Sequence, residues 1–243
     1  MSMTPLAERL LDRYYAGVPH PYRTFEERVG GLVTGTTQVL LDAGCGRTAP
    51  VLRKFLGRVP RLVGVDLVEF KDVAPGIETH HADLAVLPLD SGSVDLIMSR
   101  SVFEHLAEPE AVYTEFARVL TPGGKAVFLT ANMWDYGTLV ARLVPNRLHG
   151  RVVKAVEGRA EEDTFPTAYR TNTRRDVRRL AEHAGLRVAS FEYLSQYPNY
   201  LLFNGALFFV GMCFEKLIAR FDALALLRGW ILVTLEKPGM RST

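Results

Sequence analysis

The sequence has few cysteines and no apolar segment at its start. Cys45 and Cys213 are its only cysteines, and no metal-ligand spacing surrounds either of them. This pattern excludes a disulfide framework and gives no indication of a zinc site, so we expect a reducing, cytoplasmic location and no metal ion. Residues 1–9 carry acidic and basic side chains and lack an apolar core of signal-peptide length, so nothing there predicts export.

The sequence also has little net charge. Its formal net charge is +2 at pH 7, whereas nucleic-acid-binding proteins usually concentrate basic charge far more strongly. We therefore expect no nucleic-acid partner. The basic run at 174–179 (RRDVRR) is interpreted as solvated helix surface whose charges are distributed around the helix axis.

Length and apolar periodicity predict the fold class. A chain of 243 residues, 48% hydrophobic, fits one domain with additions. Most of its apolar runs are separated by helix-favouring segments, which predicts an α/β fold with a doubly wound, mainly parallel sheet and helices on both faces. We expect a helix at 108–120, a turn at 122–124 and a strand from Lys125. The predicted strands lie at 39–41, 61–68, 77–82, 94–99, 125–131, 186–194 and 230–235.

The segment 39–46 (VLLDAGCG) is the most informative part of the chain. It predicts a buried strand and a tight glycine turn, followed by a helix and a second strand ending at Asp66. Gly44 and Gly46 would let the backbone approach a ligand at the carboxyl edge of the sheet. Two glycines alone also fit an ordinary tight turn, but Asp66 is placed to accept hydrogen bonds from ribose hydroxyls. The pattern therefore favours a nucleoside-bearing cofactor.

Two cofactors fit this turn. Gly44, Gly46 and Ala49 satisfy the dinucleotide pattern, so an NAD(P)-dependent oxidoreductase is one alternative, and a non-catalytic cofactor-binding partner protein is another. However, Asp42 would place a negative charge near a pyrophosphate. The same carboxylate suits the sulfonium and ammonium groups of S-adenosylmethionine, which the charge argument favours.

Six segments in order resemble class I S-adenosylmethionine-dependent methyltransferases, of the small-molecule type. They are 41–46 (LDAGCG), 64–67 (GVDL), 81–84 (HADL), 87–97 (LPLDSGSVDLI), 101–106 (SVFEHL) and 120–125 (LTPGGK). The resemblance covers 38–132 closely, although Thr48 stands where the family often has a third glycine. It implies a Rossmann-like seven-stranded sheet with an antiparallel last strand, 231–238, and helical insertions after strands five and six.

The resemblance also implies a cofactor site at the carboxyl ends of the strands. Asp66 would hold the ribose, and Asp83 would face the adenine amine. The candidate cofactor-binding residues are Asp42, Gly44, Cys45, Gly46, Asp66, Leu67, Asp83, Leu84 and Ser99.

The protein needs few catalytic groups, because the sulfonium cofactor supplies its own leaving group and alignment with exclusion of water accelerates the transfer. His105 is the candidate base, since imidazole ionises near neutral pH and His105 follows the fourth strand. A histidine in such a segment is often structural, and Glu104 is the weaker candidate. Residues 99–102 (SRSV) lack the proline-aromatic motif of enzymes that methylate DNA bases, so we expect a small acceptor, lipophilic or aromatic.

The expected additions to the core define the candidate acceptor site. We divide the chain into an N-terminal helical cap (1–37), a cofactor-binding core (38–132) and insertions at 134–170 and 195–229. Ordinary packing would also explain the aromatic and polar residues of the first insertion. The candidate acceptor contacts are Asn132, Trp134, Tyr136, Tyr169 and Arg170.

The hydrophobic insertion at 195–229 is open to three interpretations. Its apolar stretch 200–214 is interrupted by Asn204 and is shorter than the roughly 20 residues that span a bilayer, so no transmembrane segment is predicted. The insertion could bury a helix against the sheet or a second copy in a homodimer. It could also line a lipophilic acceptor pocket or make peripheral contact with a membrane.

Overall fold

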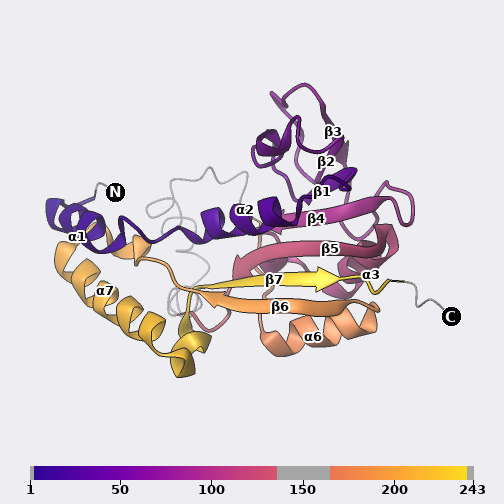
Figure 1. Ribbon diagram of the computed structural model, residues 1–243. Helices are drawn as coiled ribbons and strands as arrows, with labels where there is room; N and C mark the ends of the chain where they lie inside the picture. Colours follow the sequence, from indigo (N-terminus) through magenta and orange to yellow (C-terminus); the bar gives the residue numbers. More distant parts are fainter. Residues whose placement is uncertain (1–2, 136–164, 240–243) are drawn as a thin grey trace. The chain divides into compact units, whose positions relative to one another are not determined.

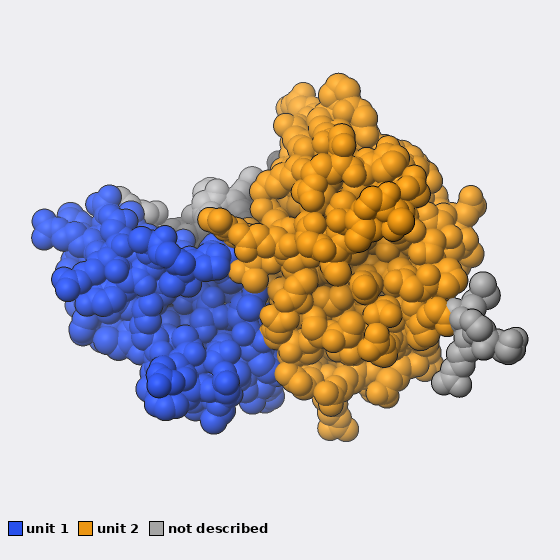
Figure 2. All heavy atoms as spheres, viewed as in Figure 1, with its two compact units in different colours: residues 1–21, 131–167, 193–231 blue, residues 22–130, 168–192, 232–243 orange. Residues whose placement is uncertain are grey.

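The computed structural model describes residues 3–135 and 165–239, and its chain forms two compact units. The sheet unit comprises 22–130, 168–192 and 232–243, and the helical unit comprises 1–21, 131–167 and 193–231 (Figure 2). Each unit is described by itself. The N-terminal segment and the insertion at 195–229 supply most of the described part of the helical unit.

The sheet unit contains the predicted seven-stranded sheet, in the order β3-β2-β1-β4-β5-β7-β6 (Figure 1). The pairs β2–β3, β1–β2, β1–β4 and β4–β5 are parallel. The last strand, β7, is antiparallel, which confirms the predicted fold class. The strands are β1 (Val39–Ala43), β2 (Arg61–Asp66), β3 (Ile77–His81), β4 (Val94–Arg100), β5 (Leu120–Ala131), β6 (Arg187–Leu194) and β7 (Trp230–Glu236).

The central strands form the core because they are apolar on both faces. Leu41 of β1 pairs with Val63 of β2 and Ile97 of β4, and all three side chains are fully buried. Three helices belong wholly or mainly to this unit: α2 (Pro21–Leu32), α3 (Pro109–Val119) and α6 (Arg174–His183). Helix α3 packs against α6. The predicted helix at 108–120 is therefore confirmed, and the basic run at 174–179 lies on a helix, as interpreted.

One predicted helix is wrong. The glycine turn is followed only by the short 3-10 helix η1 (Leu52–Phe55). Pro50 disfavours the α conformation at the residue before it, and Ala49 indeed has a φ of 44°. Gly57, with a φ of 72°, ends the segment a few residues later. There is too little chain between these two points for an α-helix.

The predicted turn at 122–124 lies inside a strand. Strand β5 begins at Leu120, and Gly123, with a φ of 84°, donates its N–H to the carbonyl of Lys237 at 2.8 Å. The register between β4 and β5 shifts between Val94 and Leu96. The proline and glycines therefore mark an irregular strand start and not a separate turn.

The interpretation of the basic run was also wrong in part. In α6 the side chains of Val177, Leu180 and Ala181 are buried, and the four arginines are exposed. At 3.6 residues per turn the four arginines occupy about 140° of the helix circumference. The positive charges are therefore gathered on one face.

The helical unit is built on the packing of α1 (Pro5–Tyr15) against α7 (Gly205–Arg220). Asn204, which interrupts the apolar run, caps α7: its side-chain oxygen accepts from the N–H groups of Ala206 and Leu207, each at 3.1 Å. A Cβ on Gly205 would lie 2.7 Å from Leu6, so the absent side chain allows close approach of α1. The 3-10 helices η4 (Asn199–Leu201) and η5 (Asp222–Leu227) flank α7.

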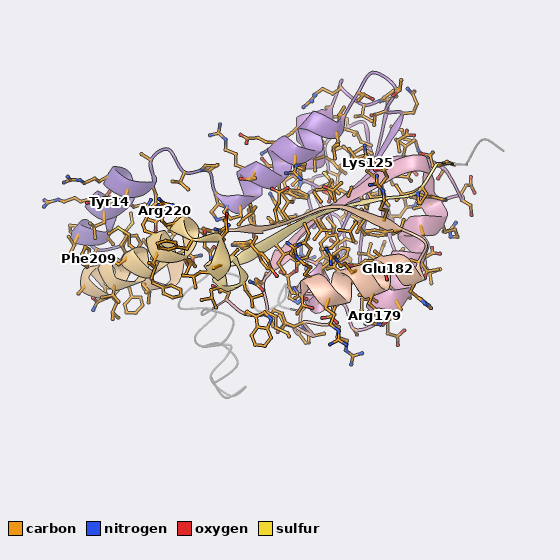
Figure 3. All side chains as sticks on the ribbon, turned by 60° about the horizontal axis from the view of Figure 1, so that its bottom comes forward. Tyr14, Lys125, Arg179, Glu182, Phe209 and Arg220 are labelled. Atoms are coloured by element: carbon orange, nitrogen blue, oxygen red, sulfur yellow. The ribbon has the colours of Figure 1, made fainter. Side chains whose placement is uncertain are left out.

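Helix α7 is apolar on two opposite faces. Phe208, Met212 and Ile218 are buried, whereas Val210 and Leu217 on the other side are 65% and 50% exposed. Phe209, labelled in Figure 3, is also exposed. No helix within the described ranges 3–135 and 165–239 has both the length and the apolar character to cross a membrane.

Candidate active site

The glycine turn at the carboxyl end of β1 is held by the end of β2. Gly44 donates its N–H to the carbonyl of Val65 at 2.8 Å. Asp66 accepts the N–H of Gly46 at Oδ2, at 2.7 Å, and that of Val68 at Oδ1, at 3.2 Å. A carboxylate oxygen accepts more than one hydrogen bond. Asp66 therefore organises the turn and retains acceptor capacity for ribose hydroxyls.

The two glycines of the turn have different roles. Both have positive φ values, 83° for Gly44 and 72° for Gly46. A Cβ on Gly44 would lie 2.2 Å from Cγ2 of Val102, so internal packing requires this glycine. A Cβ on Gly46 would meet nothing within 4 Å. Backbone is thus left open at Gly46, as the close approach of a cofactor requires.

Asp42, next to this turn, has a buried carboxyl group. Its side chain is 3% exposed, and no hydrogen bond from the described residues reaches its carboxylate. Burial raises the pKa of Asp42 to about 7; the nearby Arg100 opposes this shift and Asp66 adds to it. Such a carboxylate fits a cationic ligand group, which would supply the charge compensation that burial removed.

The adenosine end of the candidate site is formed by β2 and β3. The N–H of Ala82 donates to the carbonyl of Asp66 at 3.0 Å, which ties the loop after β3 to Asp66. Asp83 is exposed and accepts the N–H of Ala85 at 2.9 Å, and the side chain of Leu67 is 52% exposed. Asp66, Asp83 and Leu67, the candidate contacts of the cofactor's adenosine part, therefore lie together at the accessible carboxyl ends of β2 and β3.

Three other candidate cofactor-binding residues are buried and pack behind this edge of the sheet. The Sγ of Cys45 lies 2.7 Å from where a Cβ on Gly64 would be, and burial raises the pKa of its thiol. Ser99 is fully buried and donates its hydroxyl to the carbonyl of Ala43 at 2.7 Å, while Leu84 is 6% exposed. These side chains hold β1, β2 and the neighbouring loops in place.

Sequence reasoning missed Arg100, at the end of β4. Its guanidinium lies 4.4 Å above the ring of Tyr22 and pairs with Glu26 at 3.1 Å. The hydroxyl of Tyr22 lies 3.1 Å from that of Ser101, a non-glycine residue with a φ of 57°. Strained backbone of this kind concentrates at functional sites. The available signal was an arginine directly after a buried strand.

A buried polar cluster lies where β4 and β5 end. Glu104 is 7% exposed, and its carboxylate accepts the hydroxyl of Thr130 at 2.7 Å. Thr130 in turn accepts the side-chain amide of Asn172 at 2.8 Å. The main-chain carbonyl of Glu104 also accepts the N–H of Tyr169 at 3.1 Å. Glu104 thus joins the ends of β4 and β5 to the segment that carries Tyr169.

The predicted catalytic and acceptor residues are partly brought together. Arg170 donates to the carbonyl of Ala107 at 2.7 Å. His105 is half-buried in the 3-10 helix η2 (Phe103–His105), and its N–H donates to the carbonyl of Val102. In the sheet unit, Tyr169, Arg170 and His105 therefore lie around Glu104 and its neighbours.

The other acceptor candidates belong to the helical unit. The amide nitrogen of Asn132 donates to the carbonyls of Leu226 and Arg228 at 2.6 and 2.7 Å, so this side chain fastens the chain before β7. Trp134 is 43% exposed, and Tyr136 lies outside the described residues. Three or more metal-binding side chains do not converge anywhere in 3–135 or 165–239.

The sheet order and the antiparallel β7 define a Rossmann-like methyltransferase fold, and the open glycine turn between strand ends is its candidate cofactor site. Residues 41–128 match the family described as "Methyltransferase domain". Over this stretch the chain is similar to the class I S-adenosylmethionine-dependent methyltransferases. S-Adenosylmethionine is the cofactor of this family.

Relatives and solved structures agree with this assignment. A probable S-adenosylmethionine-dependent methyltransferase of Mycolicibacterium smegmatis is 32% identical over 130 residues, 49% of this chain and 47% of that protein. A malonyl-[acyl-carrier protein] O-methyltransferase of Hahella chejuensis is 33% identical over 111 residues, 40% and 37% of the two chains. The chain thus spans less than half the length of these relatives. Geranyl diphosphate C-methyltransferase of Streptomyces coelicolor shares the fold, with a TM-score of 0.55, 16% identity and 96% and 98% coverage.

Proposed function

We propose that this protein transfers a methyl group from S-adenosylmethionine to a small-molecule acceptor. The observation that carries the proposal is the open backbone at Gly46, whose N–H is bonded to Asp66, in the turn that follows the buried Asp42. Asp42 argues against the alternative NAD(P)-dependent oxidoreductase, because a pyrophosphate beside a buried carboxylate would be repelled. The bound cofactor would supply an activated methyl group on a sulfonium leaving group.

The charged ends of the site suit the two ends of this cofactor. Asp66 would accept hydrogen bonds from the ribose, and Asp83 would accept one from the adenine amine. Asp42 would face the ammonium group, and Arg100, whose charge already acts on Asp42, would face the carboxylate of the methionine part. The pairings of Asp42 and Arg100 place opposite charges together, and all four are charge-assisted hydrogen bonds, which are strong.

The acceptor would meet the methyl group at the carboxyl ends of β4 and β5. Glu104 would position the acceptor side through its bonds to Thr130 and to the main chain of Tyr169. His105 would take a proton where the acceptor must lose one. Alignment and exclusion of water would supply most of the rate enhancement for an in-line displacement. Tyr169 favours an apolar or aromatic acceptor. The cytoplasmic location predicted from the two cysteines stays a prediction.

We further propose a second copy of this chain as the occupant of the outer face of α7. The exposed residues Ala206, Val210, Cys213 and Leu217 follow one another at intervals of four, three and four residues. This spacing forms a seam along a helix of the kind that packs against a second helix. The insertion at 195–229 would then serve as a homodimer interface, and peripheral contact with a membrane is the competing outcome.

Calorimetry tests the proposed cofactor and acceptor chemistry. We expect S-adenosylmethionine and its demethylated product to bind, and NAD and NADP not to bind at the same site. Binding of a nicotinamide cofactor alone would contradict the proposal. Detection of methyl transfer to a panel of small apolar and aromatic acceptors would separate an enzyme from a non-catalytic cofactor-binding protein.

A further inference from the structure

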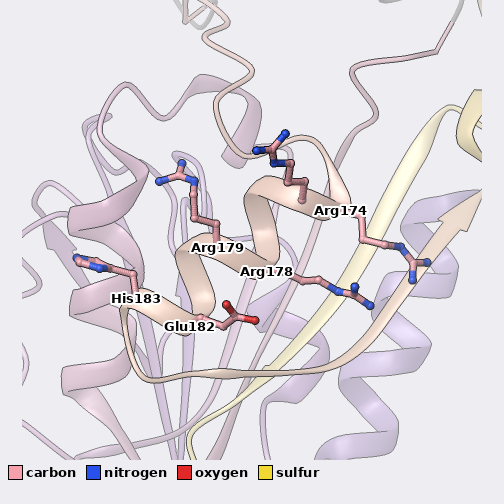
Figure 4. A pocket seen from close by; sticks show the side chains of 6 residues that line it. Arg174, Arg178, Arg179, Glu182 and His183 are labelled. Atoms are coloured by element: carbon pink, nitrogen blue, oxygen red, sulfur yellow. The ribbon is translucent and has the colours of Figure 1, made fainter.

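The outer face of α6 carries a group of arginines that the candidate active site does not use. Arg174, Arg175, Arg178 and Arg179 line an open depression together with Glu182 and His183. Figure 4 shows the side chains of Arg178 and Arg179 leaving this outer face in different directions, with Glu182 on the following turn. The buried face of α6 contains no charged side chain, so the helix presents its arginines to solvent.

Only part of this positive charge is neutralised within the sheet unit. Arg179 pairs with Glu110 at 3.2 Å, and the guanidinium of Arg174 lies 4.6 Å from the ring centre of Phe191. Neither Arg175 nor Arg178 has a hydrogen bond or an ion pair among the described residues. Two guanidinium groups therefore stand available on one side of a single helix.

This arrangement opposes the local preferences of a helix. Arg174 and Arg178 are four residues apart, as are Arg175 and Arg179, and like charges at this spacing repel each other. The arginines also lie in the first half of the helix, where its dipole favours negative charge. Asp176, in a capping arrangement with Thr173, offsets only part of the cost. Local preferences are typically violated in this way where a function requires it.

We propose that the arginine face of α6 is a docking surface for an acidic helix of a partner protein. A helix of this length offers a strip of about 15 Å, which matches the face of another helix. Acidic side chains border the strip, with Glu110 on α3 beside it and Glu182 at its end. A long polyanion such as nucleic acid would extend past the strip and meet the negative charges of Glu110 and Glu182, which disfavours it. A short row of carboxylates on one helix fits between these two glutamates. Arginine forks bind carboxylates with two parallel hydrogen bonds.

The arginine face lies near the candidate acceptor residues, which indicates what a docked partner would do. Helix α6 begins directly after Asn172, which is bonded to Thr130 at the carboxyl end of β5. A protein docked on the arginines would therefore lie beside the edge where the acceptor candidates Tyr169 and Arg170 stand. The surface suits a partner that delivers or receives the small molecule.

Peptide binding tests this surface without turnover, so its failure would leave the proposed methyl transfer untouched. The probe is an alanine-based helical peptide of about 20 residues with glutamates on one face, and the same peptide with glutamines is its reference. We expect the wild type to bind the glutamate peptide only. The double variant Arg175→Gln/Arg178→Gln should bind it about tenfold more weakly.

The matched control is Arg9→Gln/Arg13→Gln, which removes the same charge from exposed positions on α1. It should bind the peptide like the wild type, and both double variants should keep the affinity for S-adenosylmethionine, which verifies folding. Equal losses in the two double variants would show a general charge effect and overturn the proposal. Binding of a dT oligonucleotide or phosphatidylglycerol vesicles through Arg175 and Arg178, without peptide binding, would also overturn it.

Discussion

At the scale of single residues, Asp66 has two roles. It accepts the N–H groups of Gly46 and Val68, and in the proposed complex it also accepts ribose hydroxyls. Replacing a charged acceptor with a neutral amide should weaken these bonds while keeping the shape of the side chain.

Asp66→Asn should therefore weaken binding of S-adenosylmethionine by about 1–3 kcal/mol. Calorimetry measures the loss, and thermal melting verifies that the variant is folded. Asp12→Asn, at an exposed position on α1, is the control and should bind normally. Unchanged affinity in folded Asp66→Asn would refute the ribose assignment.

Asp42 makes stability depend on pH. Its pKa is raised by burial to about 7, above the value of an unfolded aspartate, so the folded state holds the proton more tightly. The stability of the cofactor-free protein should fall as pH rises from about 4 to 7, by up to about 4 kcal/mol from this group. Asp42→Asn should remove this dependence.

Urea unfolding at pH 5 and pH 8 measures this effect. At pH 8 the variant Asp42→Asn should be more stable than the wild type and should bind S-adenosylmethionine more weakly. A variant that is less stable than the wild type at pH 8 would contradict the assignment of Asp42 as an uncompensated buried anion.

At the scale of structural elements, the two glycines of the turn have different roles: Gly44 is needed for stability and Gly46 for cofactor binding. Gly44→Ala places a Cβ against Val102 in a backbone conformation that alanine disfavours, so it should cost about 2–4 kcal/mol of stability. Gly46→Ala meets open space and should cost about 1–2 kcal/mol, from the positive φ alone. Its main effect should be on cofactor affinity, because the new methyl group occupies the exposed turn.

Urea unfolding and calorimetry on the two variants give the comparison. Adding Val102→Ala to Gly44→Ala should recover part of the lost stability, since it removes the clashing atom. Equal loss of stability in Gly44→Ala and Gly46→Ala, with equal cofactor affinity, would contradict the division of roles.

The sequence predicted the elements whose signals are local. Most strands appeared as apolar runs, and the helix at 108–120 appeared through the helical spacing of its apolar residues. The helix expected after the glycine turn failed because Pro50 and Gly57 left no room for it. The turn predicted at 122–124 failed because its glycines pair with Lys237, a contact between distant parts of the chain.

In the candidate site, too, residues with local sequence signals were predicted and residues that depend on distant contacts were not. Asp42 and Asp66 were found because they follow strands directly. Thr130 and Arg100 were missed, because their partners Asn172 and Tyr22 become neighbours only in the fold. Ser99 looked accessible at a strand end, yet its hydroxyl is turned to the carbonyl of Ala43. A residue's position at the end of a strand predicts that it lies at the carboxyl edge of the sheet, but it does not predict where its side chain points.

At the scale of the whole molecule, the outer face of α7 decides the assembly state. We expect the wild type to sediment as a dimer at tens of micromolar, and Val210→Glu/Leu217→Glu to sediment as a monomer, because each substitution puts a charge into the apolar seam. Val86→Glu is the control, since Val86 is 73% exposed in the sheet unit. A monomeric wild type that binds phosphatidylglycerol vesicles through Val210 and Leu217 would assign this face to a membrane instead.

The packing of α1 on α7 has a consequence for the order in which the chain matures. The hydroxyl of Thr4 donates to the carbonyl of Leu202, 198 positions further along. At a synthesis rate of about 5–20 residues per second, the first helix leaves the ribosome roughly 10–40 s before its partner exists. During that interval Ala7 and Tyr15 have no surface of α7 to cover them, so the inner face of α1 is buried only after α7 has been synthesised.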